Sequence, residues 1–368
     1  MNITYLLGAG ASANCLPVMA ELPIRLRELL FNIQRATIQN NPTEIQFKEN
    51  KDRANALQLC KDIEWLLKEL RAHTTIDTLA KKFYLQMDQQ DSLVLLKKIM
   101  IAYFYYEQAF QEGMIRPGVV KQLPDKRYDS LIATIIDKKR GSFKLPNNFK
   151  IITWNYDFQF ELAYRVYLPA LSMDEVQKKL GVFPTKEFFH DSEVFDINKF
   201  SLIRLNGVAG LNSYVSRVDN VAYDDLEFAN LNLLTAVVRA YSNMSIDEIK
   251  AFNYSWEVVG DFNLIFERKS YLKDYAKKII LNTDVLVIIG YSFPNFNRSV
   301  DKDLFKNAYG LKRIYIQDAN ALAIEDLLRS VIPILQEHDM RRGEFFYTRE
   351  IKTITETDQF FIPPEAEF

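Results

Sequence analysis

Residues 3–10 read Ile3-Thr4-Tyr5-Leu6-Leu7-Gly8-Ala9-Gly10, an apolar run that ends abruptly in a glycine-rich turn. The run predicts a buried strand, and the turn continues through Ala11 and Ser12. A glycine turn directly after a first strand lets the backbone approach a diphosphate and present N–H groups to it. The third glycine of the dinucleotide fingerprint is absent, and a plain tight turn is the alternative. The position of the turn favours a nucleotide-binding loop.

Four later stretches also read as strands, and each ends in polar residues or glycine. They are residues 149–153, 201–205, 284–289 and 311–316. The run at 284–289 is apolar after its first residue, which is typical of a parallel strand buried on both faces. Helical periodicity separates the strands, so the sequence predicts an α/β fold with a Rossmann-like, doubly wound parallel sheet. Ligands of such sheets bind beyond the carboxyl ends of the strands, where the residues after each strand should converge.

Helical spacing of apolar residues dominates from about residue 20 to 115, and a helix with Tyr128, Leu131 and Ile135 follows. We therefore predict one nucleotide-binding domain over residues 1–340 with a helical insertion at about 20–145. A second, mostly helical stretch is expected from about 222 to 282. Residues 341–368 are expected to form a C-terminal strand or tail.

Composition excludes several classes of protein. The chain has 368 residues, 48% of them hydrophobic, and a formal net charge of -2, so no direct nucleic-acid binding is expected. The first apolar run stops at Gly8, too short for a signal peptide or a membrane span, so no membrane association is expected. Cys15 and Cys60 are the only cysteines, which excludes a four-cysteine zinc site and favours a reducing cytoplasm.

Polar side chains follow the second and third strands. Asn155 and Asp157 place an amide and a carboxylate two residues apart at the end of the strand 149–153. Either could instead cap the next helix, although capping explains one of them better than both. Asn206 and Gly207 end the strand 201–205, where a simple turn pair is the alternative.

The last two strands end in further candidate ligands. Gly290, Tyr291 and Ser292 combine close backbone approach with a hydroxyl that can donate to phosphate. Asp318 follows the strand 311–316, where a carboxylate can hold a ribose hydroxyl pair or, equally well, cap a helix. None of the histidines, His73, His190 and His338, stands at a strand end, so none is assigned a chemical role.

Taken in order, these motifs resemble the sirtuin-like NAD-binding family. The set is Gly8-Ala9-Gly10-Ala11-Ser12, Trp154-Asn155-Tyr156-Asp157, Asn206-Gly207 and Gly290-Tyr291-Ser292. It is closest to the zinc-free bacterial branch found in antiphage defence, and it spans residues 1 to about 320. The resemblance implies that the glycine turn binds the diphosphate, Asn155 and Asp157 lie beside the nicotinamide ribose, and Gly290 and Ser292 touch phosphate and ribose. Asp318 matches only by position a residue that holds the adenosine ribose.

Two departures from the family bear on activity. The zinc-ribbon cysteines have no counterpart, which argues against a protein deacylase and implies no zinc. Asn206 stands where the family has its catalytic histidine, and an amide cannot accept a proton at neutral pH. Losing a general base costs on the order of 100- to 10,000-fold in rate. Three explanations of Asn206 are open. The chain is a natural variant that uses Asn155 and Asp157 alone, or a sensor that only binds, or a protein in which the histidine was deliberately replaced.

The resemblance implies an NAD+ glycohydrolase that releases nicotinamide and ADP-ribose and depletes NAD+ in bacterial antiphage defence. NAD+ is then the substrate, and the catalytic residues are Asn155, Asp157 and Asn206. The alternative is a non-catalytic NAD or ADP-ribose sensor, or an assembly subunit of a defence complex. A homo-oligomer and a partner such as a DNA-translocating ATPase are further implications of the resemblance.

Overall fold

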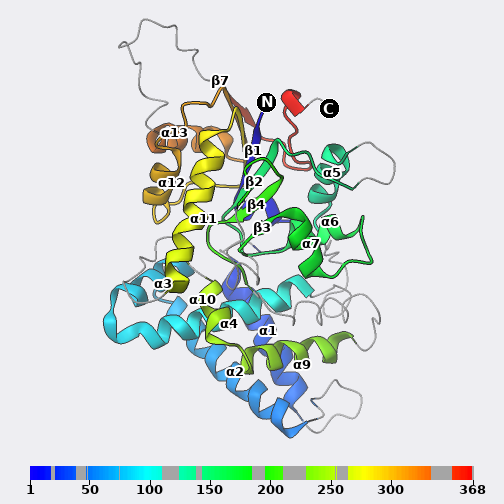
Figure 1. Cartoon of the computed structure of the whole chain (residues 1–368). Helices are drawn as coiled ribbons and strands as arrows, with labels where there is room; N and C mark the ends of the chain where they lie inside the picture. The colour runs from blue at the N-terminus through cyan, green and yellow to red at the C-terminus, as the bar shows by residue number, and fades with distance from the viewer. Residues whose placement is uncertain are drawn as a thin grey trace, which may run out of the picture.

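Seven parallel strands form one sheet in the computed structural model (Figure 1). The structure describes residues 1–17, 21–38, 47, 49–73, 75–109, 124–137, 143–184, 195–209, 229–252, 254, 264–332 and 350–366. The strands are β1 (Ile3–Leu7), β2 (Phe149–Thr153), β3 (Val182–Phe183), β4 (Ser201–Arg204), β5 (Val285–Ile289), β6 (Arg313–Gln317) and β7 (Glu350–Ile354). Their order across the sheet is β3-β4-β2-β1-β5-β6-β7. The chain therefore places β2 beside β1, forms the edge strand β3, and inserts β4 between β2 and β3 before β5, β6 and β7 extend the sheet on the other side of β1.

Side chains alternate between the two faces of the sheet because successive residues of a strand point in opposite directions. Tyr5 and Leu7 pack on one face with α5 (Lys126–Ile135), α6 (Gln159–Arg165) and α7 (Met173–Leu180). Leu6 packs on the other face with α11 (Leu264–Leu281), α12 (Arg298–Phe305) and α13 (Ala321–Val331). Helices thus cover both faces, which explains why β1 and β5 are buried along their whole length.

A separate layer of helices lies beyond the carboxyl ends of the strands (Figure 1). It contains α1 (Leu22–Thr37), α2 (Asn50–Leu70), α3 (Ile76–Leu85), α4 (Gln90–Ala109), α9 (Ala229–Ser242) and α10 (Ile246–Ala251). α9 packs against α2 and α4, and Arg239 of α9 forms an ion pair with Asp52 of α2 at 2.6 Å. We call this group of helices the helical layer.

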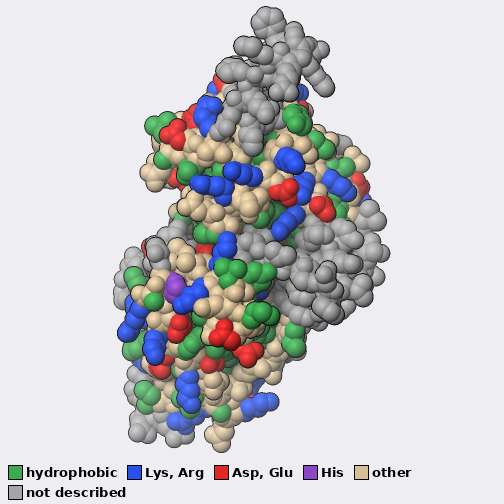
Figure 2. Space-filling model, turned by 90° about the vertical axis from the view of Figure 1, so that its left-hand side faces the viewer, with side chains coloured by type: hydrophobic (Ala, Val, Ile, Leu, Met, Phe, Trp, Pro, Cys, Tyr) green, Lys and Arg blue, Asp and Glu red, His purple; other side chains and the backbone are tan. Residues whose placement is uncertain are grey.

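The helical layer thus combines two parts of the chain. The helices α1 to α4 contribute to it together with α9 and α10, whereas α5 belongs to the sheet through the buried side chains of Tyr128, Leu131 and Ile132. Figure 2 shows one face of the molecule, on which Lys and Arg side chains are spread over both the sheet half and the helical layer. Within the described ranges, no helix is both long and apolar enough to span a membrane.

The predicted strands are confirmed to within two residues at their ends, the largest difference being the start of β6, and the parallel α/β class is confirmed with them. β3 was not predicted, because two residues are too few to show a period. The strand predicted within 341–368 corresponds to β7. His190 and His338 lie outside the described residues.

Candidate functional site

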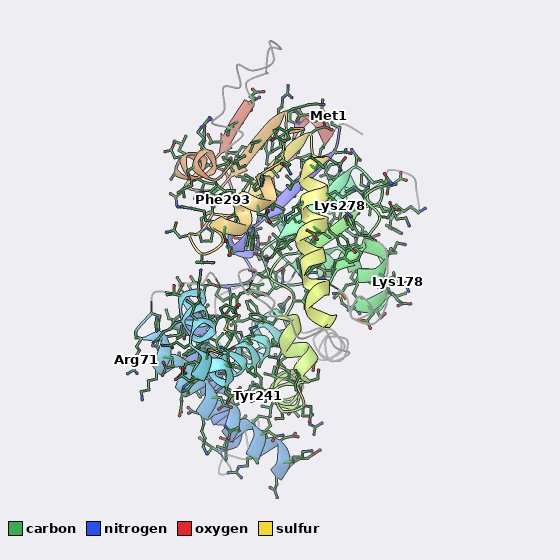
Figure 3. The ribbon with its side chains drawn as sticks, turned by 60° about the vertical axis from the view of Figure 1, so that its left-hand side comes forward. Met1, Arg71, Lys178, Tyr241, Lys278 and Phe293 are labelled. Atoms are coloured by element: carbon green, nitrogen blue, oxygen red, sulfur yellow. The ribbon has the colours of Figure 1, made fainter. Side chains whose placement is uncertain are left out.

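The register of the sheet aligns the carboxyl ends of five neighbouring strands. Leu7 pairs with both Thr153 and Ile289, Thr153 pairs with Arg204, and Ile289 pairs with Gln317. The segments that follow these residues contain every predicted site residue. The parallel pairing therefore brings them to one edge of the sheet, which faces the helical layer (Figures 1 and 3).

The glycine turn packs tightly against the loop after β5. The N–H of Gly8 donates to the carbonyl of Ile289 at 3.0 Å, and the N–H of Gly10 donates to the carbonyl of Gly290 at 3.0 Å. A Cβ on Gly8 would lie 2.4 Å from the Gly290 carbonyl oxygen, and one on Gly290 would lie 2.5 Å from the nitrogen of Ala11. Gly290 also has a φ of 59°, a conformation that favours glycine. Loop packing thus requires these glycines, while their contact with phosphate stays a prediction.

Ser12 connects the glycine turn with the polar residues that follow β2. Its hydroxyl oxygen lies 3.3 Å from the amide nitrogen of Asn155 and 3.1 Å from the hydroxyl of Tyr128, and Ser12 is close enough to Asp157 to lower the pKa of that carboxyl. The amide nitrogen of Asn155 can only donate, so the hydroxyl oxygen of Ser12 accepts from it. Asn155 also donates to the carbonyl of Gly8 at 2.9 Å. Ser12, Asn155 and Asp157 therefore form one buried polar group, which we call the Ser12 cluster.

Burial raises the pKa of the Asp157 carboxyl above its usual value. The hydrogen bond from the N–H of Gln159, at 3.0 Å, and the nearby Ser12 hydroxyl oppose that rise. The nearby guanidinium of Arg204 also lowers the pKa. Hydrogen bonding and positive charge thus support a carboxylate in a place where burial alone would disfavour it.

Arg204 is fully buried at the end of β4, next to the Ser12 cluster. It donates to the carbonyl of Asp157 at 2.9 Å and forms an ion pair with Glu161 of α6 at 2.5 Å. Its Nη1 is buried without a hydrogen-bond partner among the described residues. Arg204 thus connects β4, the loop after β2 and α6 directly beneath the site.

Asn206 lies at the same level as Asn155 on the neighbouring strand. The N–H of Leu205 donates to the carbonyl of Thr153 at 2.9 Å, so the pairing of β2 with β4 continues one step into the loops. The side-chain amide of Asn206 donates to the carbonyl of Trp154 at 3.1 Å, and the side chain is buried. Gly207 then turns the chain with a φ of 75°.

The side chain of Tyr291 is part of the core. Its ring stacks on Trp154 with centroids 5.4 Å apart, and its hydroxyl donates to Asp301 of α12 at 2.9 Å. A ligand contact from Tyr291 would thus come from its backbone, whereas Ser292 is exposed. Phe293, labelled in Figure 3, follows with a φ of 49° and a buried side chain.

Asp318 lies half-buried at the end of β6. Its Oδ1 accepts from the N–H of Asn320 at 2.8 Å, in the turn that begins α13. The N–H of Gly290 donates to the carbonyl of Gln317 at 3.1 Å, which keeps this turn beside the loop after β5. The turn interpretation of Asp318 thus has direct support, and its contact with ribose stays a prediction.

The beginning of α5 supports the glycine turn from below and was not predicted as part of the site. Arg127 donates to the carbonyls of Gly10 and Ala11 at 3.3 and 3.0 Å and pairs with Asp125 at 2.7 Å. Asp125 shows a capping signal in the sequence, because it precedes a helix and accepts from the N–H of Arg127. Nothing local in the sequence shows that Arg127 reaches a loop more than a hundred residues earlier.

Tyr156, between the two polar residues of the Asn-x-Asp motif, points into the helical layer instead of toward the Ser12 cluster. Its ring stacks on Phe252 with centroids 4.2 Å apart and lies 5.5 Å from Phe104 of α4. The side chain of Gln108 in α4 also accepts from the N–H of Phe158. The helical layer is therefore anchored to the same short loop that carries Asn155 and Asp157.

The described part of the chain brings together no group of three side chains suited to a metal ion. The site is instead a set of amides, hydroxyls, two carboxylates and glycine backbone at a strand edge, which suits a sugar and phosphate ligand. No known protein-family model matches the chain, and no curated protein matches it in sequence.

Proposed function

We propose that this chain is a sirtuin-like NAD+ glycohydrolase, with NAD+ bound along the carboxyl edge of a Rossmann-like, doubly wound sheet. The single observation that carries the proposal is the Ser12 cluster. Ser12 from the glycine turn accepts a hydrogen bond from Asn155 and lies close enough to Asp157 to lower the pKa of its carboxyl. A turn suited to phosphate and a carboxylate suited to a developing cation thus belong to one buried polar group.

The order of the strands supports the same assignment. Asn206 and Asp157 follow β4 and β2, the glycine turn follows β1, and Gly290 and Asp318 follow β5 and β6. In an extended dinucleotide, the nicotinamide ribose would lie at the ends of β4 and β2, the diphosphate at β1 and β5, and the adenosine ribose at β6. Four steps between neighbouring strands cover about 19 Å, at ~4.8 Å each. The polarity of NAD+ along the edge follows from this order.

In the proposed reaction, the bond between nicotinamide and ribose breaks and its electron pair passes to the ring nitrogen. The ring leaves neutral and positive charge develops on the sugar. A water oxygen then bonds to the sugar carbon and gives up a proton to solvent water. Asp157 stabilises the charge on the sugar, Asn155 positions the water or the ribose hydroxyls, and Asn206 holds the ribose. Because Asn206 cannot take a proton, the chain is expected to be slow.

The decisive test is chromatography of NAD+ incubated with the protein, with two site variants and with one control variant. Asn206→His restores a proton acceptor and should raise nicotinamide release by about 100-fold or more. Asp157→Asn keeps the shape but removes the charge and should abolish release. Asn307→Ala, a change at an exposed asparagine, is the matched control and should leave release unchanged. Absence of nicotinamide with both the parent chain and Asn206→His would defeat the hydrolase proposal.

The nature of Asn206 favours one alternative, a sensor that binds NAD+ or ADP-ribose without cleaving it. Its amide is already hydrogen-bonded to the carbonyl of Trp154. Calorimetry separates the two functions: NAD+ binding that Asn155→Ala weakens, with no product even for Asn206→His, would favour the sensor. Release of nicotinamide by either chain would exclude it.

A further inference from the structure

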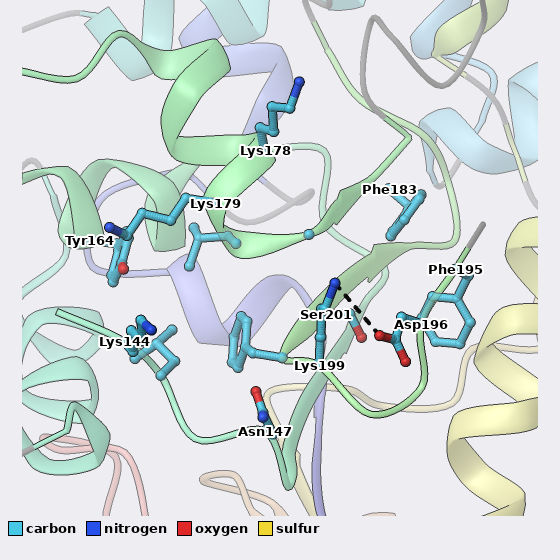
Figure 4. Close-up of a pocket in the computed structure, with 14 residues that line it drawn as sticks. Lys144, Asn147, Tyr164, Lys178, Lys179, Phe183, Phe195, Asp196, Lys199 and Ser201 are labelled. Carbon is cyan, nitrogen blue, oxygen red and sulfur yellow. Dashed lines mark ion pairs between the residues drawn. The ribbon is translucent and has the colours of Figure 1, made fainter. Parts of the chain in front are cut away.

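A cavity of about 640 Å³ lies at the opposite edge of the sheet from the Ser12 cluster (Figure 4). Gly181 before β3, Ser201 at the start of β4 and Asn147 before β2 line it, so it opens at the amino ends of these parallel strands. Its size lies within the range of about 300–1,000 Å³ typical of sites for small organic ligands. The proposed NAD+ site does not account for it.

The wall of the cavity carries an excess of positive charge. Four lysines line it, at positions 144, 178, 179 and 199, against the single carboxylate of Asp196. Asp196 pairs with Lys199 at 3.6 Å, as the dashed line in Figure 4 shows. In the described ranges, no carboxylate pairs with Lys144 or Lys179. The cavity therefore favours an anion, and lysine ammonium groups are common phosphate ligands.

Ser201 contributes an unsatisfied hydroxyl to the same cavity. Its side chain is 2% exposed, and its Oγ is buried with no hydrogen-bond partner among the residues that the structure describes. A buried hydroxyl without a partner is unfavourable, so most such groups in proteins are hydrogen-bonded. A small opening of the wall at Ser201 would let a ligand oxygen satisfy it. This observation is independent of the lysines.

The remaining wall is aromatic. Phe183 and Phe195, which belong to the core on the α11 face of the sheet, line this part of the cavity and are largely buried, and Phe195 is held by stacking on Tyr275 with centroids 4.5 Å apart. Rings fixed in this way offer a rigid apolar surface to a planar group. A bare inorganic anion would leave that surface unused. The ligand should thus combine an anion with an aromatic part.

We propose that the cavity is a binding site for a nucleoside phosphate. The phosphate lies against Lys144 and Lys179, the Ser201 hydroxyl bonds a ligand oxygen, and the base packs against the phenylalanine wall. The site is separate from the carboxyl edge and does not depend on NAD+ hydrolysis.

Isothermal titration calorimetry of the full chain with AMP, adenosine and inorganic phosphate tests the proposal. AMP should bind about tenfold or more tightly than adenosine or phosphate, since only AMP uses both walls. The double variant Lys144→Glu/Lys179→Glu should weaken AMP binding by about tenfold or more. The control Lys302→Glu/Lys306→Glu makes the same charge change at exposed lysines of α12 and the residue after it, and should have no effect. Circular dichroism verifies that each variant is folded.

Three outcomes would overturn the proposal: no AMP binding at millimolar concentration, equal binding by the Lys144→Glu/Lys179→Glu protein, or equal weakening by the control. An Asp318→Ala variant separates this cavity from the carboxyl edge. If AMP binding is lost in Asp318→Ala and kept in the lysine variant, AMP occupies the other site and the proposal is wrong. Nicotinamide release is measured separately, so failure of the hydrolase proposal leaves this result intact.

Discussion

At the scale of single residues, Gly290 shows how closely two loops of the site approach. An alanine there would place its Cβ 2.5 Å from the backbone of Gly10 and Ala11, in a left-handed conformation with φ 59°. Crowding and conformation together should lower the free energy of unfolding of Gly290→Ala by about 2–5 kcal/mol. Urea denaturation measures the change.

Gly310→Ala is the matched control for Gly290→Ala. Its nearest neighbour would be the carbonyl oxygen of Leu281 at 3.2 Å, and its backbone is not left-handed. We expect a loss of less than about 1 kcal/mol. Equal losses for the two variants would contradict the close approach of the two loops.

Asp301 gives the molecule a pH dependence that can be measured. Burial raises the pKa of its carboxyl to about 8, although the Tyr291 hydroxyl and Arg298 act to lower it. The folded protein binds this proton more tightly than the unfolded chain does, so protonated Asp301 adds to the free energy of unfolding, and its contribution is complete below about pH 4. This contribution is lost as the pH rises toward 8, by at most about 1.4 kcal/mol per pH unit.

Asp301→Asn should remove this dependence. Its amide oxygen can still accept from Tyr291, but no proton is bound or released. Urea denaturation at pH 5, 6.5 and 8 should give a flatter profile for the variant than for the parent chain, with the largest gain at pH 8. Parallel profiles would mean that Asp301 is ionised throughout this range.

At the scale of elements, α5 supports the glycine turn through Arg127. Arg127→Leu removes the bonds to the carbonyls of Gly10 and Ala11 and leaves the Asp125 carboxylate buried without its ion-pair partner. Breaking a buried pair in this way should cost about 3–5 kcal/mol. Thermal denaturation or urea titration measures it.

A double variant shows how much of that cost comes from charge. Asp125→Asn keeps the capping oxygen at the start of α5 but removes the carboxylate. Asp125→Asn/Arg127→Leu should therefore be more stable than Arg127→Leu alone. If the double variant is less stable, the bonds to the turn and not the charge account for the loss.

Elements that a local sequence pattern defines could be predicted well. Apolar runs and the polar residues after them predicted β1, β2, β4, β5 and β6, and the parallel pairing aligned their ends as expected. The contacts inside the site could not be predicted in the same way. The bonds from Ser12 to Asn155 and from Arg127 to Gly10 join residues more than a hundred positions apart, and hydrophobic periodicity carries no information about such pairs.

At the scale of the whole molecule, the sequence predicted one helical insertion, but the helical layer draws on two segments. α9 and α10 follow β4 and pack with α2 and α4, because each group of helices has an apolar face that needs a partner. The helical character of both segments was predicted; their association was not. Periodicity reports which face of a helix is apolar but not which other helix covers it.

The two layers should unfold together, since Tyr156 and Gln108 join them at the carboxyl edge. Leu96→Ala, at a fully buried position of α4, should lower the free energy of unfolding by about 2–5 kcal/mol. Hydrogen exchange should then speed up in β1 and β5 as well as in the helices. Leu322→Ala, at an exposed position of α13, is the control and should change stability by less than about 0.5 kcal/mol. Faster exchange in the helices alone would mean that the layers open independently.

The placement of Tyr156 has a mechanical consequence. Successive residues of one short loop point to opposite sides, with the tyrosine ring held among aromatic side chains of the helices and its two polar neighbours held at the sheet. A rotation of the helices relative to the strands would therefore change the distance between the amide of Asn155 and the carboxylate of Asp157. A partner that binds the outer helices would thus act on the positions of Asn155 and Asp157 through this loop.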